Sequence, residues 1–210
     1  TRSEAKKFLR IYELYVKEER IFDPSIKAYH NDIKINNEAL DPETITILLN
    51  KPSGFICSHN DAGSLIYALI PQRWNRRNPK ISTIGRLDVD TTGAIILTDD
   101  GALNHKLSSP KSDVSKVYEA TLAVPLKGDE KEIFASGELM LNGEKKPLLP
   151  AKLEVLGETH VRLEICEGKY HQVKRMFAAV GNRVLTLHRV SFGGFTVEDL
   201  KEGEYKFIEL

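Results

Sequence analysis

Residues 84–101, IGRLDVDTTGAIILTDDG, join an acidic loop to an apolar segment and are the most informative part of the sequence. The apolar part, residues 94–98, has the composition of a strand that is buried on both faces. The loop before it carries Asp88 and Asp90 between two glycines. In an extended segment these two carboxylates would point the same way. Because loops at a sheet edge often meet substrates, this loop is the first candidate for a functional site.

Short strands and short helices alternate on both sides of this segment. Strand patterns are expected at residues 44–49, 55–58, 116–124 and 183–190, with a hairpin pairing residues 151–156 and 161–166. Helical patterns are expected at residues 64–70, 102–107 and 170–180. The order lacks the strict strand–helix–strand alternation of a parallel sheet. We therefore predict an α+β domain built on a largely antiparallel, mixed sheet.

The first 41 residues have a different pattern of expected secondary structure from the rest of the chain. Residues 3–10 begin like a helix, and short strand patterns separated by turns follow. Lys6, Lys7 and Arg10 share one face of this helix because they are three and four residues apart. Pro42 marks a natural boundary. We therefore predict two domains, residues 1–41 and residues 42–210.

The charge of the chain is balanced overall but unevenly distributed. The sequence has 30 basic and 30 acidic residues, which counts mildly against a nucleic-acid-binding protein. Binding depends on the local field, however, and not on the total charge. Residues 72–86 contain Arg73, Arg76, Arg77, Lys80 and Arg86 and no acid. This stretch is either a solvated basic loop or a patch that faces RNA.

The composition argues against several other classes of protein. Hydrophobic residues make up 41% and charged residues 29%, an ordinary globular balance. Cys57 and Cys166 form no disulfide framework or metal-ligand pattern, so we expect a reducing, cytoplasmic location and no metal. The longest apolar stretches are too short to cross a bilayer, so we expect no membrane association. No secretory leader is visible at the start of the sequence.

Asp88 and Asp90 allow several interpretations. They can be ordinary surface acids in turns. They also match the first positions of a calcium loop that would end at Asp99, but such a loop needs flanking helices and a final glutamate. A carboxylate pair can hydrolyse a glycoside, although no further acid motif supports this. Finally, an ionised aspartate can act as a nucleophile.

Four segments favour the last interpretation, because together they resemble the RsuA-like family of ribosomal RNA pseudouridine synthases. They are residues 51–54 (KPSG), 85–101 (GRLDVDTTG and the strand after it), 116–118 (KVY) and 167–176 (EGKYHQVKRM). Each is a weak signal alone, but they occur in the family's order over most of the chain. The resemblance implies the family's catalytic domain at residues 42–210. Residues 1–41 resemble the small RNA-binding module that precedes it, and we expect this module to be N-terminally incomplete.

The resemblance assigns roles to individual residues. It makes Asp88 the nucleophile and Lys174 the cation that keeps it ionised, at a position where related synthases often carry arginine. Tyr118 would lie against the uracil ring, and Ile165 would pack under the same ring. Arg86 would fill the space left when the target uridine is flipped out. The family's reaction requires no cofactor and no metal.

The resemblance also implies an RNA partner. The residues expected to contact RNA are Arg175, Arg86, Lys6, Lys7, Arg10, Arg73, Arg76 and Arg77. Residues 170–181 look closest to the small-subunit enzyme, so the expected substrate is a uridine of 16S rRNA, modified by a monomer. Two alternatives remain: a synthase acting on 23S rRNA, and a non-catalytic RNA-binding ribosome-assembly factor. The product formed, isomerised RNA or none, distinguishes an enzyme from an assembly factor.

Overall fold

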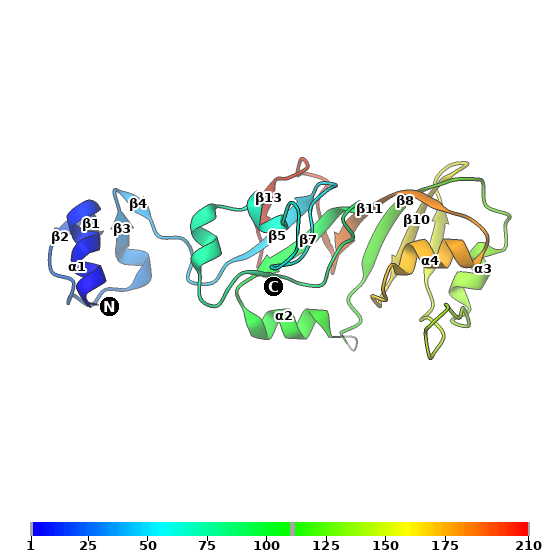
Figure 1. The fold of residues 1–210 in the computed structure, drawn as a ribbon, viewed down its shortest axis with the longest axis horizontal. Coiled ribbons are helices and arrows are strands. Elements are labelled where there is room, and N and C mark those ends of the chain that lie inside the picture. The colour runs from blue at the N-terminus through cyan, green and yellow to red at the C-terminus, as the bar shows by residue number, and fades with distance from the viewer. Residues whose placement is uncertain (1, 110–111, 210) are drawn as a thin grey trace. The chain divides into compact units, whose positions relative to one another are not determined.

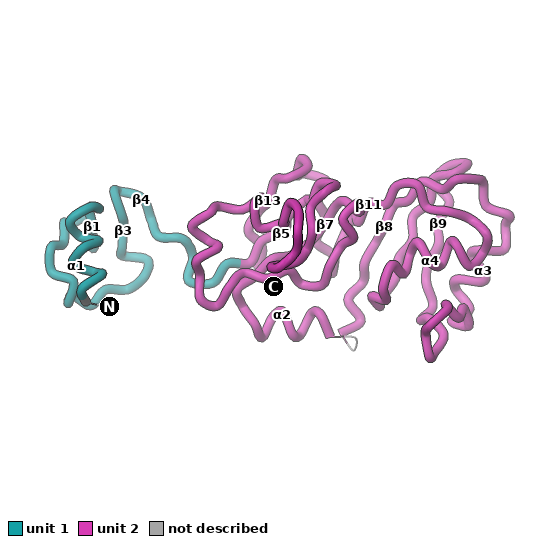
Figure 2. Tube along the Cα trace, viewed as in Figure 1, with its two compact units in different colours: residues 1–45 teal, residues 46–210 magenta. Residues whose placement is uncertain are grey.

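The computed structural model describes residues 2–109 and 112–209, and the chain divides into two compact units. Unit 1 comprises residues 1–45 and unit 2 comprises residues 46–210 (Figure 2). The expected boundary after residue 41 lies close to this division, whereas an RNA-binding role for the first unit stays a prediction. In the described ranges no helix has both the length and the apolar character needed to cross a membrane.

Unit 1 is built from local hairpins. It consists of α1 (Arg2–Ile11), β1 (Leu14–Val16), β2 (Glu19–Ile21), the 3₁₀ helix η1 (His30–Asp32), β3 (Ile33–Ile35) and β4 (Glu38–Ala39). The four strands form an antiparallel sheet in the order β2-β1-β3-β4. The turns at Lys17-Glu18 and Asn36-Asn37 have positive φ at both residues. This is the geometry that favours a two-residue hairpin loop, and it sets the strand register.

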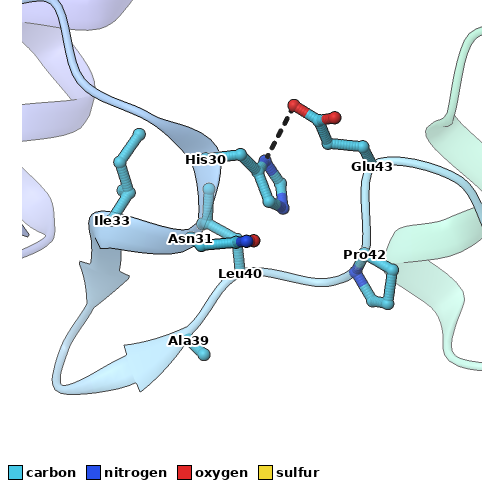
Figure 3. A pocket seen from close by; sticks show the side chains of 7 residues that line it. All are labelled: His30, Asn31, Ile33, Ala39, Leu40, Pro42 and Glu43. Carbon is cyan, nitrogen blue, oxygen red and sulfur yellow. Dashed lines mark ion pairs between the residues drawn. The ribbon is translucent and has the colours of Figure 1, made fainter.

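An open pocket of unit 1 lies where the chain leaves this sheet (Figure 3). His30, Leu40 and Glu43 are among the side chains that line it. Nε2 of His30 lies 2.8 Å from the carbonyl oxygen of Asp41, so this nitrogen carries a proton. Nδ1 of the same ring lies 3.9 Å from Oε1 of Glu43, which is an ion pair only when the imidazole is protonated. The histidine thereby holds the segment that ends unit 1.

Unit 2 is built on one mixed sheet (Figure 1). The strand order is β13-β5-β7-β11-β8-β10-β9, with β6 added to β7 and β12 to β11. The strands are β5 (Thr46–Lys51), β6 (Ser82–Thr83), β7 (Thr92–Thr98), β8 (Lys116–Leu122), β9 (Lys152–Val155), β10 (His160–Ile165), β11 (Val184–Phe192), β12 (Phe195–Thr196) and β13 (Tyr205–Phe207). Among the described strands β7 and β11 pair in parallel and the other pairs are antiparallel. The prediction of a largely antiparallel, mixed sheet is confirmed.

Helices cover parts of this sheet. They are η2 (Ile66–Leu69), η3 (Gln72–Arg76), α2 (Gly101–Ser108), α3 (Glu130–Ala135) and α4 (Gln172–Ala179). The Asp100 carboxylate caps α2 by accepting two backbone N–H groups of its first turn. Leu103 and Leu107 of α2 pack on a core cluster that includes Leu48 of β5, Ile96 of β7 and Phe192 of β11. The rings of Phe134 in α3 and Phe177 in α4 meet edge to face, with centroids 5.2 Å apart.

Residues 55–70 differ from the sequence-based expectation. The strand predicted at residues 55–58 is wrong, because Ile56 makes only an isolated bridge with Leu65. The backbone groups of Ile56 bond to Ser64 and Ile66 within the same loop, and so they are not available to the sheet. A turn at Gly54, with φ of +87°, precedes this loop. The helix predicted at residues 64–70 is a short 3₁₀ helix, η2.

The parallel strands β7 and β11 approach each other closely at Gly93. This residue pairs with Arg189 in the register and has a φ of +104°. A Cβ atom here would overlap the backbone of Arg189, so the close approach requires glycine. Arg189 is 2% exposed, and its Nε donates to the carbonyl oxygen of Ala94 at 2.6 Å. These contacts fix the start of β7 and thereby the end of the acidic loop.

Candidate active site

A buried lysine shapes the loop that carries Asp88. Lys51, at the end of β5, is 0% exposed. Its Nζ donates to the backbone carbonyl oxygens of Asp88, Val89 and Thr91 at 3.1, 3.2 and 2.8 Å. The backbone N–H of Gly54 adds a bond of 2.8 Å to the carbonyl of Val89. Burial lowers the pKa of Lys51, and these carbonyl dipoles supply the polar contacts that a buried ammonium requires.

The carboxylate of Asp88 has a partner on each oxygen. Oδ1 lies 3.2 Å from Nε2 of His171, and Oδ2 lies 3.3 Å from Nζ of Lys174. The side chains of Asp88 and Lys174 are 27% and 26% exposed, so the pair is partly shielded but open to a substrate. The two contacts fix the orientation of the Asp88 carboxylate and place an ammonium group beside it.

Lys174 is shared between two acids. Its Nζ lies 2.7 Å from Oδ1 of Asp90, closer than to Asp88. This hydrogen bond holds the pKa of Asp90 below its usual range. Burial opposes the charge of Lys174, but the bonds and charges of Asp90 and Asp88 outweigh it and raise the pKa of the lysine. The Asp90 side chain is 64% exposed, so it is the more open of the two carboxylates.

Tyr118 lies on the strand next to β11. It is 8% exposed and pairs with Arg189 in the register, as Gly93 does from the other side. Two strand spacings, roughly 10 Å, therefore separate Tyr118 from the start of β7. Nη1 of Arg189 lies 3.4 Å from the hydroxyl of Tyr118. Ile165, 3% exposed, ends the neighbouring strand β10. The sheet thus brings the phenol into the vicinity of the acidic loop.

The predicted RNA contacts fall into two groups. Those that are exposed to solvent are Arg73, Arg76 and Arg86 in unit 2 and Lys6, Lys7 and Arg10 in unit 1. Arg77 and Arg175 already have acidic partners: Arg77 pairs with Asp99, and Nη1 of Arg175 lies 3.1 Å from Oε1 of Glu144. RNA contacts by these two residues stay predictions, although their present partners compete with such a role.

Three residues of this site were given no individual role from the sequence, although Lys51 and His171 lie in the segments that carry the resemblance. His171 contacts Asp88, Lys51 shapes the loop and Arg189 contacts Tyr118. The helical pattern of residues 170–180 does not place His171, because this residue precedes α4 in a left-handed conformation. Sequence alone gives no sign that Lys51 and Arg189 are buried, since most such side chains are exposed.

The calcium-loop interpretation does not fit the structure. Residues in the second half of that loop belong to β7, which begins at Thr92 and runs to Thr98. Asp99, which would supply the last ligand, is 8% exposed and pairs with Arg77. A strand cannot wrap around an ion as the second half of such a loop must.

Comparisons with known proteins identify the family. The family model described as RNA pseudouridylate synthase matches residues 45–179. Ribosomal small subunit pseudouridine synthase A of Haemophilus influenzae is 43% identical over 211 residues, covering 98% of this chain and 89% of that protein. The protein of the same name from Escherichia coli K12 is 48% identical over 163 residues, covering 76% of this chain and 68% of that protein.

A solved structure gives the same result for the fold. The crystal structure of a pseudouridylate synthase superposes with a TM-score of 0.73 at 42% sequence identity, covering 100% of this chain and 90% of that one. The matched family model includes the Asp88 loop, Tyr118 and Lys174. The chain therefore belongs to the RNA pseudouridylate synthase family.

Proposed function

We propose that this protein converts a uridine of small-subunit (16S) ribosomal RNA into pseudouridine, with Asp88 as the nucleophile. The observation that carries the proposal is the Asp88 carboxylate, which has Lys174 on one oxygen and His171 on the other. The names of the similar proteins, ribosomal small subunit pseudouridine synthase A, support the choice of RNA. We further propose that the protein acts in the cytoplasm as a monomer.

The reaction is an isomerisation and needs no second reactant. The bond between N1 of uracil and C1′ of the sugar breaks, and a bond between C5 and C1′ forms; C5 loses a proton and N1 gains one. In the first step Asp88 attacks as the carboxylate, with the ammonium of Lys174 beside it to balance its charge. Tyr118 lies against the uracil ring and helps to move the C5 proton. Because Arg189 can only donate, the Tyr118 oxygen accepts from it, and the phenol proton is left for another partner.

The remaining site residues hold the RNA. Ile165 packs against the flipped base, and Arg86 occupies the gap that the base leaves in the RNA. The exposed cations of α1 and η3 bind phosphates, namely Lys6, Lys7, Arg10, Arg73 and Arg76. We assign unit 1 to RNA binding on this basis. Binding through phosphates weakens as salt rises, so the affinity should fall steeply with ionic strength.

The proposal is tested by mapping pseudouridine on transcripts of 16S and 23S rRNA after incubation with the protein. Three forms are compared: the wild type, Asp88→Asn and Asp90→Asn. Wild type should create one new site in 16S rRNA, and Asp88→Asn should create none because the amide is not nucleophilic. Asp90→Asn is the matched control, two residues away and bound to the same lysine. It should retain activity within about tenfold.

Other outcomes would change the proposal in defined ways. A new site in 23S rRNA would keep the reaction and overturn the choice of RNA. Modification that persists with Asp88→Asn would overturn the assignment of the nucleophile. Salt-sensitive binding of RNA without any modification would favour the assembly-factor alternative.

A further inference from the structure

An exposed aromatic ring stands next to the nucleophile. Tyr170 is 75% exposed, one of the most exposed aromatic side chains in the described part of the chain. Its ring stacks on that of His171, with centroids 3.8 Å apart and planes tilted by 18°. His171 in turn reaches Oδ1 of Asp88 at 3.2 Å. Two stacked rings therefore connect the nucleophile to the solvent, and one face of the outer ring is uncovered.

The segment that carries the two rings is held in place by hydrogen bonds. The backbone N–H of Lys169 donates to Oε1 of Gln172 at 2.8 Å, and Nε2 of the same glutamine donates to Oε1 of Glu167 at 3.0 Å. Nη1 of Arg175 donates to the carbonyl oxygen of Tyr170 at 3.0 Å. A segment fixed in this way loses little conformational entropy of its backbone when a ligand binds to it.

The backbone of His171 is itself in an uncommon conformation. Its φ of 46° and ψ of 37° are left-handed, which costs roughly 1–2 kcal/mol for a residue with a side chain. The residue is the N-cap of α4, but its side chain makes no capping hydrogen bond there. Instead the ring lies between Asp88 and Tyr170. The strained turn thus presents both rings together.

We propose that the outer face of Tyr170 is the stacking site for a nucleobase next to the target uridine. This inference rests on the proposed function. When the uridine leaves the stack, its neighbour loses a stacking partner, and an aromatic ring at the rim of the site can replace it. Stacking on an aromatic ring tolerates any base, so the site contributes affinity and not base identity.

The test uses the full chain and a short RNA hairpin that contains the mapped uridine. Tyr170→Ala should raise KM about tenfold, the usual size of one base–aromatic stack, with kcat changed much less. Tyr170→Phe keeps the ring and should recover most of the lost affinity. An abasic nucleotide placed on one side of the uridine should raise the KM of the wild type by a similar factor. The same abasic RNA should cause no further loss in Tyr170→Ala, because the stack is already absent.

Two results would overturn the stacking site: an unchanged KM in Tyr170→Ala, or abasic and Tyr170→Ala effects that simply multiply. Failure of the proposed function is seen separately, as no pseudouridine from the wild type. In that case the dissociation constants of wild type and Tyr170→Ala are measured with intact and with abasic RNA. These four values test the stacking site without requiring catalysis. Thermal unfolding of Tyr170→Ala should match that of the wild type, since the ring is exposed.

Discussion

Two regions hold the Asp88 loop, and they do so through different atoms. Lys51, at the end of β5, contacts only backbone carbonyl oxygens and is completely buried. His171 and Lys174, at the start of α4, contact the carboxylates of Asp88 and Asp90 and are partly exposed. Both regions supply a cation, but only the second lies beside the acidic groups themselves.

The first region therefore fixes the shape of the Asp88 loop, and the second sets the electrostatic environment of its carboxylates. A buried ammonium is stable only while its hydrogen bonds are complete, so Lys51 ties the loop backbone to the stability of the fold. A partly exposed ion pair adds little stability, yet it orients the Asp88 carboxylate and balances its charge. Substitutions in the first region should therefore change unfolding, and substitutions in the second should change turnover.

The largest effect is expected for Lys51→Met. The loop carbonyls of Asp88, Val89 and Thr91 would lose their common donor inside the protein, which should cost about 3 kcal/mol of unfolding free energy. For a chain of this size the midpoint of thermal unfolding should fall by roughly 6–12 °C. Lys206→Met is the matched control, because that lysine only pairs with Asp199 at the surface. Equal unfolding midpoints for the two variants would contradict the structural role.

Lys174→Met should have the opposite effect from Lys51→Met: a large loss of turnover with little change in stability. Without the ammonium, Asp88 loses the partner 3.3 Å away, and kcat should fall about a hundredfold. The unfolding free energy should change by less than about 1 kcal/mol. Lys174→Arg restores the charge and should recover most of the turnover. If Lys174→Met lost stability but kept its turnover, Lys174 would have a structural role like that of Lys51. The proposed difference between the two regions would then be wrong.

His171→Asn sharpens the same comparison. Asparagine tolerates the left-handed backbone at this position, so the variant removes the imidazole contact with Asp88 without straining the turn. We expect kcat to fall about tenfold, which corresponds to a loss of roughly 1.4 kcal/mol of stabilisation when the contact with the carboxylate is removed. Single-turnover rates measured with saturating RNA separate this effect from weaker binding. An unchanged rate would show that turnover does not depend on the contact between His171 and Asp88.

The smallest expected effect concerns pH. The hydrogen bond from Lys174 lowers the pKa of Asp90 in the folded protein. Such a group stabilises the fold above its unfolded pKa of about 4, and this contribution is lost as the pH falls through the lower folded value. Since the Asp90 side chain is 64% exposed, the effect is weak. Unfolding midpoints between about pH 5 and 3 should fall slightly less in Asp90→Asn than in the wild type, and identical curves would contradict this.

Elements of the fold could be predicted where a short stretch of sequence determines them, and not where contacts outside that stretch do. A continuous apolar pattern predicted β7, an alternating hairpin pattern predicted β9 and β10, and a helical pattern predicted α4. The strand expected at residues 55–58 failed because its backbone groups pair within one loop. Helix α3 was missed. Its Glu130 is buried and accepts the backbone N–H groups of Lys127 and Gly128, a contact that no hydrophobic pattern reveals.

The candidate site was predictable only in part. Asp88 and Lys174 were expected to meet, and the structure places them 3.3 Å apart. The contact of His171 depends on a left-handed backbone, which is uncommon for residues other than glycine and which no local pattern predicts. The burial of Lys51 and Arg189 depends on strands that are far apart in the sequence. Local sequence therefore indicated which residues carry charge, but not which of them the fold removes from solvent.

The close approach at Gly93 has a consequence for how mutational scans of this protein should be interpreted. A single added methyl group would overlap the backbone of Arg189, so every one of the nineteen replacements should be selected against. An invariant position five residues from Asp88 would ordinarily be assigned to the reaction. Here the intolerance to substitution would result from the close approach of β7 and β11. A purified variant should therefore show a loss of stability before any defect in turnover is seen.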